Sequence, residues 1–271
     1  SNARHGHREL APSPADVYDT NAGAGDANRV ESKGLSLTGE WNVNEWLTLK
    51  SVTAQRDGLT RGNIDFDNLP APILDIPARY DDDQFSQEFQ AVFSGDRWSG
   101  VAGVYYLDAT ASGAFDTVLG LANLTTLTSG SVDTKSYAVF GEVDYKLTER
   151  LSLVAGLRWS RDDKTMDYHS RFTEAGVTLV DFHGSKSFES ISGRAVLNYD
   201  ISDNSRAYVS YNRGYKSGGF AGGMITDVQD LGPYDDEVLN AYEVGFKSEL
   251  FGRRARLNAA LGKAWEEWEI P

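Results

Sequence analysis

The chain contains no cysteine, which excludes disulfide bonds, thiol catalysis and cysteine-based metal sites. Positive charge is also scarce: 26 Lys and Arg stand against 40 Asp and Glu, which gives a net charge of −14. This charge excludes nucleic acid as an expected partner, because phosphates would repel the chain. No run of about 18 apolar residues occurs, so the sequence predicts no transmembrane helix. Membrane-barrel strands remain possible, because each needs only about 9–11 alternating residues.

The sequence does have period-2 alternation of apolar and polar residues from Gly34 onward. In residues 242–250, for example, Tyr242 and Val244 alternate with Glu243 and Lys247. Such alternation predicts strands with one apolar face and one wet face. We expect ten strands in five pairs, at residues 35–41 and 46–56, 85–93 and 98–107, 137–147 and 151–159, 191–201 and 207–215, and 242–250 and 255–261.

Connection lengths separate a membrane barrel from a soluble sandwich. Links within the pairs have tight-turn lengths, whereas links between pairs are long, at residues 57–84, 108–136, 160–190 and 216–241. Outer-membrane barrels have short turns at one end and long loops at the other, and aromatic residues at both membrane interfaces. Aromatic residues end the apolar stripes here, at Tyr137, Tyr145, Trp159, Tyr199 and Tyr211. We therefore predict an all-β fold, an antiparallel up-and-down meander of about ten strands that forms a segment of an outer-membrane β-barrel.

The boundaries of this segment follow from where the alternation holds. Residues 1–33 are expected to be an expression scar, at residues 1–3, and an irregular lead-in. Residues 34–262 form the partial barrel, and residues 263–271 an irregular tail, because Lys263 takes a position that should be apolar. On the wet face, a cross-strand charge ladder is expected from Glu243, Lys247, Arg254 and Arg256.

Candidate sites for chemistry are few. Acidic residues at 65, 67 and 81–83 could bind Ca²⁺, but without EF-hand spacing a solvated acidic loop is the preferred interpretation. His169 and His183 could face a ligand, but they are interpreted as loop residues, because no carboxylate or second histidine stands at a spacing that indicates a metal site. Neither a GxSxG elbow nor a Ser-His-Asp order is present. We predict no metal site, no cofactor, no catalytic residue and no enzyme activity.

Two segments, YNRGYKSGGF at 211–220 and AYEVGFKSELFGRRARLNAA at 241–260, resemble the barrel of TonB-dependent outer-membrane receptors, in the ferric-siderophore class. The chain departs from the family where Asp235-Asp236-Glu237 replaces the usual Pro-Glu before a strand. The resemblance implies a location in the bacterial cell outer membrane. It also implies energised uptake of a scarce ligand, such as a ferric siderophore, by the full-length protein.

The resemblance also implies partners and a limit. Family members have a plug domain and about 22 strands, whereas this chain has about ten strands and no plug. We therefore expect a fragment or truncated copy that meets outer-membrane lipid directly and TonB only through the missing plug. A ferric siderophore or other small nutrient ligand would bind the extracellular loops; the binding residues are unknown, with Tyr215 and Phe220 as candidates. The alternative is a stand-alone or self-associating β-barrel, joined through open sheet edges, with a structural or binding role and no transport.

Overall fold

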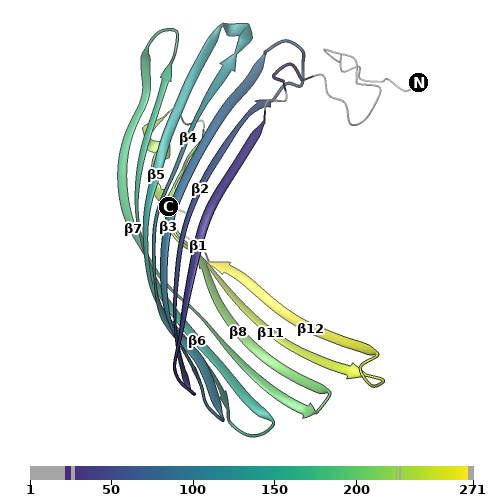
Figure 1. Cartoon of the computed structure of the whole chain (residues 1–271). Coiled ribbons are helices and arrows are strands. Elements are labelled where there is room, and N and C mark those ends of the chain that lie inside the picture. Colours follow the sequence, from purple (N-terminus) through teal and green to yellow (C-terminus); the bar gives the residue numbers. More distant parts are fainter. Residues whose placement is uncertain (1–21, 26–27, 224, 226, 268–271) are drawn as a thin grey trace, which may run out of the picture.

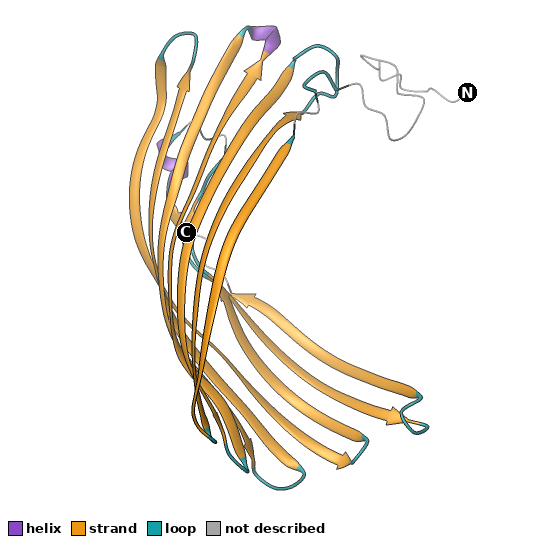
Figure 2. Ribbon diagram, viewed as in Figure 1, coloured by secondary structure: helices purple, strands orange, loops and turns teal. Residues whose placement is uncertain are grey.

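The computed structural model describes residues 22–25, 28–223, 225 and 227–267. Ten strands form one antiparallel sheet in which each strand pairs with its neighbours in the chain, in the order β1-β2-β3-β4-β5-β6-β7-β8-β11-β12. The predicted all-β meander is therefore confirmed. The sheet is a single curved layer that is open along β1 and β12 (Figures 1 and 2). The ten strands are β1 (Arg29–Asn44), β2 (Leu47–Asp65), β3 (Leu74–Ser94), β4 (Trp98–Leu119), β5 (Leu124–Lys146), β6 (Leu151–Phe172), β7 (Val177–Ser202), β8 (Ser205–Lys216), β11 (Glu237–Leu250) and β12 (Ala255–Glu267).

Most strands are much longer than the sequence predicts, and β7 reaches 26 residues. Three of the four predicted long links are wrong: only residues 66–73, 120–123 (with the 3-10 turn η1, Gly120–Ala122) and 173–176 lie outside strands there. In these upper halves both faces of the sheet carry polar residues, so the alternation fades although the backbone ladder continues. Cross-strand contacts support that ladder, as where the Thr110 hydroxyl donates to the Asp133 carboxylate at 2.6 Å.

One connection remains long. Residues 217–236, here named the β8–β11 connection, contain β9 (Gly219–Phe220), the 3-10 turn η2 (Val228–Leu231) and β10 (Pro233–Tyr234). We name the end of the sheet that carries this connection the loop end. The opposite, turn end has the short links 45–46, 95–97, 147–150, 203–204 and 251–254, in the places that the sequence predicts.

The sheet has two chemically different faces. One, the apolar face, carries Leu157 and Ile191, which are 69% and 58% exposed. The other, the polar face, carries the neighbouring Arg158 and Arg194, because successive side chains on a strand point to opposite sides. No second layer covers the apolar face in the part of the chain that the structure describes. Exposed apolar area of this extent marks contact with a membrane or a partner. No helix among the described residues is long and apolar enough to be a membrane span.

Aromatic residues lie toward both ends of the apolar face. Near the turn end, Trp98 pairs in register with Tyr145. Nearer the loop end, the rings of Tyr106 and Tyr137 lie 5.3 Å apart. Two such belts are typical of the two interfaces of a bilayer.

Two predicted boundaries need correction. Strand β1 begins at Arg29, inside the predicted lead-in, because residues 29–33 pair with residues 57–61 of the extended β2. Strand β12 continues to Glu267, so residues 263–267 of the predicted irregular tail form a strand. Pairing with β11 supplies the backbone ladder there, and the Trp265 ring stacks on Tyr242 at 5.4 Å. The predicted scar and most of the lead-in, as well as residues 268–271, lie outside the described residues.

Candidate functional site

The polar face is organised by ion pairs that cross strands. Arg194 donates two hydrogen bonds to Glu142, at 2.6 and 2.7 Å, from Nε and Nη2. The two residues lie on β7 and β5, and reach each other across Gly156 of β6, with which both are in register. A Cβ at Gly156 would meet the Glu142 carboxylate at 2.9 Å, so the missing side chain makes room for the pair. This pair therefore neutralises two charges on the wet face.

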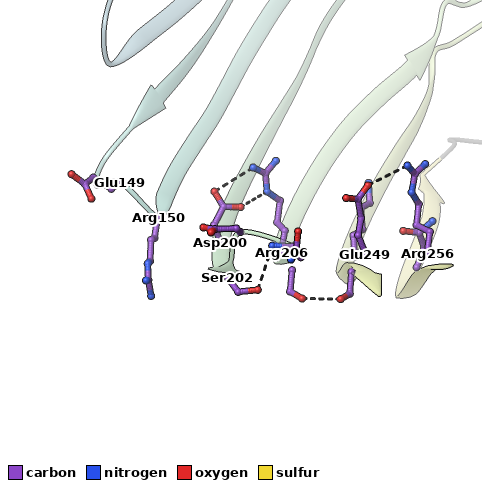
Figure 3. A pocket seen from close by; sticks show the side chains of 13 residues that line it. Glu149, Arg150, Asp200, Ser202, Arg206, Glu249 and Arg256 are labelled. Atoms are coloured by element: carbon purple, nitrogen blue, oxygen red, sulfur yellow. Dashed lines mark hydrogen bonds and ion pairs between the residues drawn. The ribbon is translucent and has the colours of Figure 1, made fainter. Parts of the chain in front are cut away.

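At the turn end of this face lies a polar cavity of about 720 Å³ (Figure 3). Arg206 donates to Asp200 at 2.6 Å, and Arg256 donates to Glu249 at 3.3 Å. The hydroxyls of Ser205 and Ser248 lie 2.7 Å apart and join β8 to β11. Several of the groups that line the cavity therefore already pair with one another.

The predicted charge ladder is present in part, with different partners. Arg256 pairs with Glu249, which also meets Arg253 at 2.9 Å. Glu243 instead accepts a hydrogen bond from the Tyr208 hydroxyl, and the Lys247 ammonium lies 5.3 Å from the centre of the Tyr208 ring. Among the described residues, Tyr208 of β8, and not an arginine of β12, is thus the side-chain partner of both Glu243 and Lys247.

The β8–β11 connection packs on the polar face at the loop end. Leu231 of η2 is fully buried, in a cluster with Met166 and Tyr168 of β6 and Val180 of β7. The β7 residues 177–192 extend beyond the part of the strand that pairs with β8, which leaves a notch in the sheet. The connection lies at this notch and supplies the main apolar cluster of an otherwise single-layered sheet.

Polar contacts hold the same connection. The Tyr168 hydroxyl donates to the carbonyl of Gly223 at 2.8 Å and accepts from the Ile225 amide at 3.1 Å. From β6 and β7, Lys164 Nζ donates to the Gly218 carbonyl at 2.6 Å, and Lys186 Nζ lies 2.5 Å from the Asp235 carboxylate.

Asp236 closes the connection. Its carboxylate accepts from the Gly218 amide at 2.7 Å and from the Ser190 hydroxyl of β7. Asp236 belongs to the Asp235-Asp236-Glu237 segment, where the sequence departs from the Pro-Glu of the family it resembles, and its hydrogen bonds hold the entry into β11.

Gly218 is a point of close approach. A Cβ there would meet both the Phe188 ring and the Tyr234 carbonyl oxygen at 2.4 Å, and the carbonyl belongs to backbone that cannot yield cheaply. We expect Gly218→Ala to loosen the connection and to speed amide exchange across residues 217–236. Gly222→Ala is the matched control, because its Cβ would have no neighbour within 4 Å. Equal exchange in the two variants would contradict this packing.

The structure places the two predicted ligand contacts apart. Phe220 lies in β9 and its ring meets Phe182 edge-on at 6.2 Å, beside the Leu231 cluster. Tyr215 pairs with Val238 of β11. It lies an even number of residues from Val209 along β8, so its side chain is on the same, apolar face. Phe220 therefore belongs to the connection's packing, whereas Tyr215 is not brought to the same surface.

Both histidines lie in strands and have acidic partners, which corrects their interpretation as unpartnered loop residues. His169 of β6 meets Asp181 at 3.0 Å, and His183 of β7 meets Asp167 at 2.7 Å. Sequence distance hid these partners, because the pairs form across the β6–β7 ladder.

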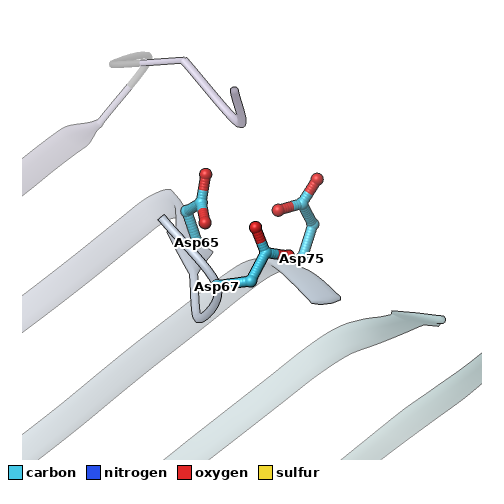
Figure 4. A group of neighbouring side chains, drawn as sticks. All are labelled: Asp65, Asp67 and Asp75. Atoms are coloured by element: carbon cyan, nitrogen blue, oxygen red, sulfur yellow. The ribbon is translucent and has the colours of Figure 1, made fainter. Parts of the chain in front are cut away.

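The acidic residues also group differently from the prediction. Asp81 pairs with Arg79 on β3, at 2.5 Å, whereas Asp65 and Asp67 meet Asp75 beside the loop 66–73 (Figure 4). Carboxylate oxygens of these three residues lie within 4.8 Å of one another. Asp65 accepts from the Asn68 amide at 2.6 Å, and Asp67 accepts from the Leu74 amide at 2.5 Å. Two of the three carboxylates thus order the loop through backbone hydrogen bonds.

The third carboxylate is held less favourably. Burial, and then the charges of Asp65 and Asp67, raise the pKa of Asp75. A raised pKa in the folded state means that the ionised form is disfavoured there, so the cost is present at neutral pH and disappears when Asp75 is protonated.

We expect Asp75→Asn to slow amide exchange in residues 66–73 at pH 7. The difference should vanish below the ordinary pKa of an aspartate. Asp83→Asn, on the same strand, should leave this loop unchanged. Faster exchange in Asp75→Asn would mean that the charge stabilises the loop.

A single sheet with one lipid-like face, aromatic belts, tight turns at one end and a charged opposite face defines the wall of an outer-membrane β-barrel. The profile of the family described as TonB dependent receptor-like, beta-barrel matches residues 2–261. The chain belongs to this family, whose members reside in the bacterial outer membrane and whose barrels serve transport receptors, not enzymes.

Comparison with individual proteins agrees in fold. The chain is 23% identical over 219 residues to the pesticin receptor of Yersinia enterocolitica, covering 79% of the chain and 30% of that receptor. It resembles the crystal structure of the ferric yersiniabactin uptake receptor FyuA from Yersinia pestis, with a TM-score of 0.77, 20% identity, and 89% and 36% of the two chains covered. The siderophore receptor PiuA from Acinetobacter baumannii gives a TM-score of 0.64 at 12% identity, covering 87% and 40%. The chain therefore spans about a third of the length of these receptors.

Proposed function

We propose that the parent protein is a receptor for energised uptake of a ferric siderophore, and that this chain is part of its barrel wall. The proposal is supported by the printed functions of the similar proteins, which include a ferric yersiniabactin uptake receptor and a siderophore receptor. In this proposal, TonB acts through a plug domain that lies outside the chain.

The observation that carries the proposal is the β8–β11 connection on the polar face at the loop end. A ligand that enters the barrel from outside would meet this surface first. Beside it, the ammonium groups of Lys164 and Lys186 lie 5.4 and 5.3 Å from the centre of the Phe188 ring. A cleft of about 620 Å³ opens there, lined by Lys186 and Phe188 and by the carboxylates of Glu189, Asp235, Asp236, Glu266 and Glu267. Lys164 forms no ion pair with a carboxylate among the described residues, so it is the cation there that an anionic iron chelate would meet.

Growth under iron limitation tests the proposal. A strain that lacks the native gene should fail to grow on the one ferric siderophore that the receptor takes up, and the intact gene should restore growth. Lys164→Gln with Lys186→Gln should reduce uptake of radioactive iron, whereas Lys247→Gln, at the turn end of the polar face, should not. Growth of the deletion strain equal to wild type on every ferric siderophore offered would overturn the proposal.

Self-association is a second proposal, favoured by the two unpaired sheet edges along β1 and β12. Unpaired strand edges are templates for pairing with another chain. Light scattering of the 271-residue chain in detergent should then give a dimer or larger species whose mass falls when proline is placed in β1. A monomer at all concentrations would exclude this proposal and would leave the receptor proposal intact.

A further inference from the structure

Beyond the aromatic belt, the apolar side of the sheet continues with charged residues such as Arg161. Two cations, however, stand within the apolar band itself, where a lipid-facing wall should have none. Arg213 of β8 is on the same face of its strand as Val209 and Tyr211, because they are an even number of residues apart. Lys263 of β12 is likewise on the same face as Leu261. Both side chains are exposed. Within the described residues neither forms an ion pair with a carboxylate, and the cross-strand partners of Arg213 are Gly193 and Asn240. Two unpaired charges on this face need an anion from outside the chain.

Their height on the wall places that anion at one interface of the membrane. Residues 205–213 of β8 and residues 255–263 of β12 are each nine residues long, counted from the tight turns. A tilted barrel strand crosses the hydrocarbon with about 9–11 residues, so both cations lie near the interface at the loop end. Aromatic rings surround them: Tyr242 lies 4.8 Å from Tyr211 and 5.4 Å from Trp265.

An apolar groove of about 430 Å³ leads away from Arg213 on the same face. Small residues form its floor, namely Gly141, Ala155, Gly193 and Ala195, and Arg213 stands at one end. Arg213 Nε donates to the Ile191 carbonyl at 3.3 Å, which fixes the guanidinium beside the groove. The only acidic residue described on this face of β12, Glu267, accepts from the Trp265 indole at 3.3 Å and does not take up either cation.

We propose that this surface binds one phosphate-bearing membrane lipid. The lipid phosphate lies between Arg213 and Lys263, and one acyl chain fills the groove over the small residues. Charge complementarity selects the occupant: a guanidinium and an ammonium at headgroup height match a phosphate, and a hydrocarbon-filled groove matches an acyl chain. A second copy of the chain would present the same two cations and would be repelled.

Native mass spectrometry of the full chain, released from bilayers, tests the proposal. Bilayers of phosphatidylcholine with a small fraction of phosphorylated lipid A should give a species that retains one lipid A. Arg213→Gln with Lys263→Gln should weaken retention by roughly tenfold or more, since each cation near an anionic lipid contributes about fivefold. Ala155→Leu with Ala195→Leu should also weaken it by filling the groove while both cations remain.

The control removes two cations from the polar face of the same strands, by Lys247→Gln with Arg256→Gln, and should retain lipid as the wild type does. Gel mobility before and after heating reports whether each variant folds. Equal retention in the folded wild type and the folded Arg213/Lys263 variant would overturn the proposal. It would equally be overturned if the Ala155/Ala195 variant retained lipid as the wild type does, since the acyl chain would then contribute nothing, or if dimers formed through this face.

Discussion

Leu231→Ala should release the β8–β11 connection from the wall while the ten-stranded sheet stays folded. Leu231 is fully buried against Met166, Tyr168 and Val180. Truncation of a buried leucine to alanine costs about 2–5 kcal/mol. The connection is a local unit attached to an extended ladder, so we expect this loss to appear as local opening. Amide exchange in residues 217–236 should accelerate by at least 30-fold, about 2 kcal/mol, with β2–β6 unchanged.

Val228→Ala is the matched control for Leu231. Both residues lie in η2, but Val228 is 50% exposed and loses little contact on truncation. Its exchange pattern should match that of the wild type. If Leu231→Ala unfolded the sheet as a whole, the connection would be part of the cooperative core and not a docked segment.

Leu197→Arg should prevent stable insertion of the wall into a bilayer, whereas Asn198→Arg should not. Leu197 lies on the apolar face of β7, in register with Leu153 and Val209. It lies between Ile191 and Ile201, which are exposed on the same face, and therefore near the middle of the apolar band. Arginine on the lipid face at the midplane costs about 2–4 kcal/mol, and much less at a polar wall.

Urea titration of the two variants in lipid vesicles measures this difference. Asn198 stands on the polar face beside Tyr208, one residue from Leu197 along the same strand. The two substitutions therefore add the same side chain at nearly the same height, and differ in face alone. Equal loss of stability in both variants would mean that the apolar face does not contact lipid.

The sequence predicted the strands best where the two faces differ most. At Tyr242 and Val244 the apolar positions face lipid, and the alternation with Glu243 and Lys247 follows directly. In β4 and β5, the residues around Ser112 and Ser131 are in register but carry small and polar side chains on both faces. Nothing in those segments requires apolar and polar residues to alternate. The sequence analysis therefore predicted loops where the structure has paired strands.

The candidate site depended on contacts that alternation cannot reveal. Tyr168 and Ile225 are 57 residues apart and meet only because β7 extends past β8. The Asp236 carboxylate holds the chain before β11 by accepting a hydrogen bond from the Gly218 amide, which lies 18 residues away. The motif around residues 211–220 indicated the family, but not that the following connection would pack on the polar face.

The central claim is that the apolar face of this wall touches lipid and the polar face touches water. Since the chain has no cysteine, single cysteines at each position from 193 to 199 of β7 can carry a spin label without background. In reconstituted vesicles, oxygen collisions should peak at 193, 195, 197 and 199, and collisions with a water-soluble nickel complex should peak at 194, 196 and 198. Nickel access that is equal at all seven positions would contradict the account.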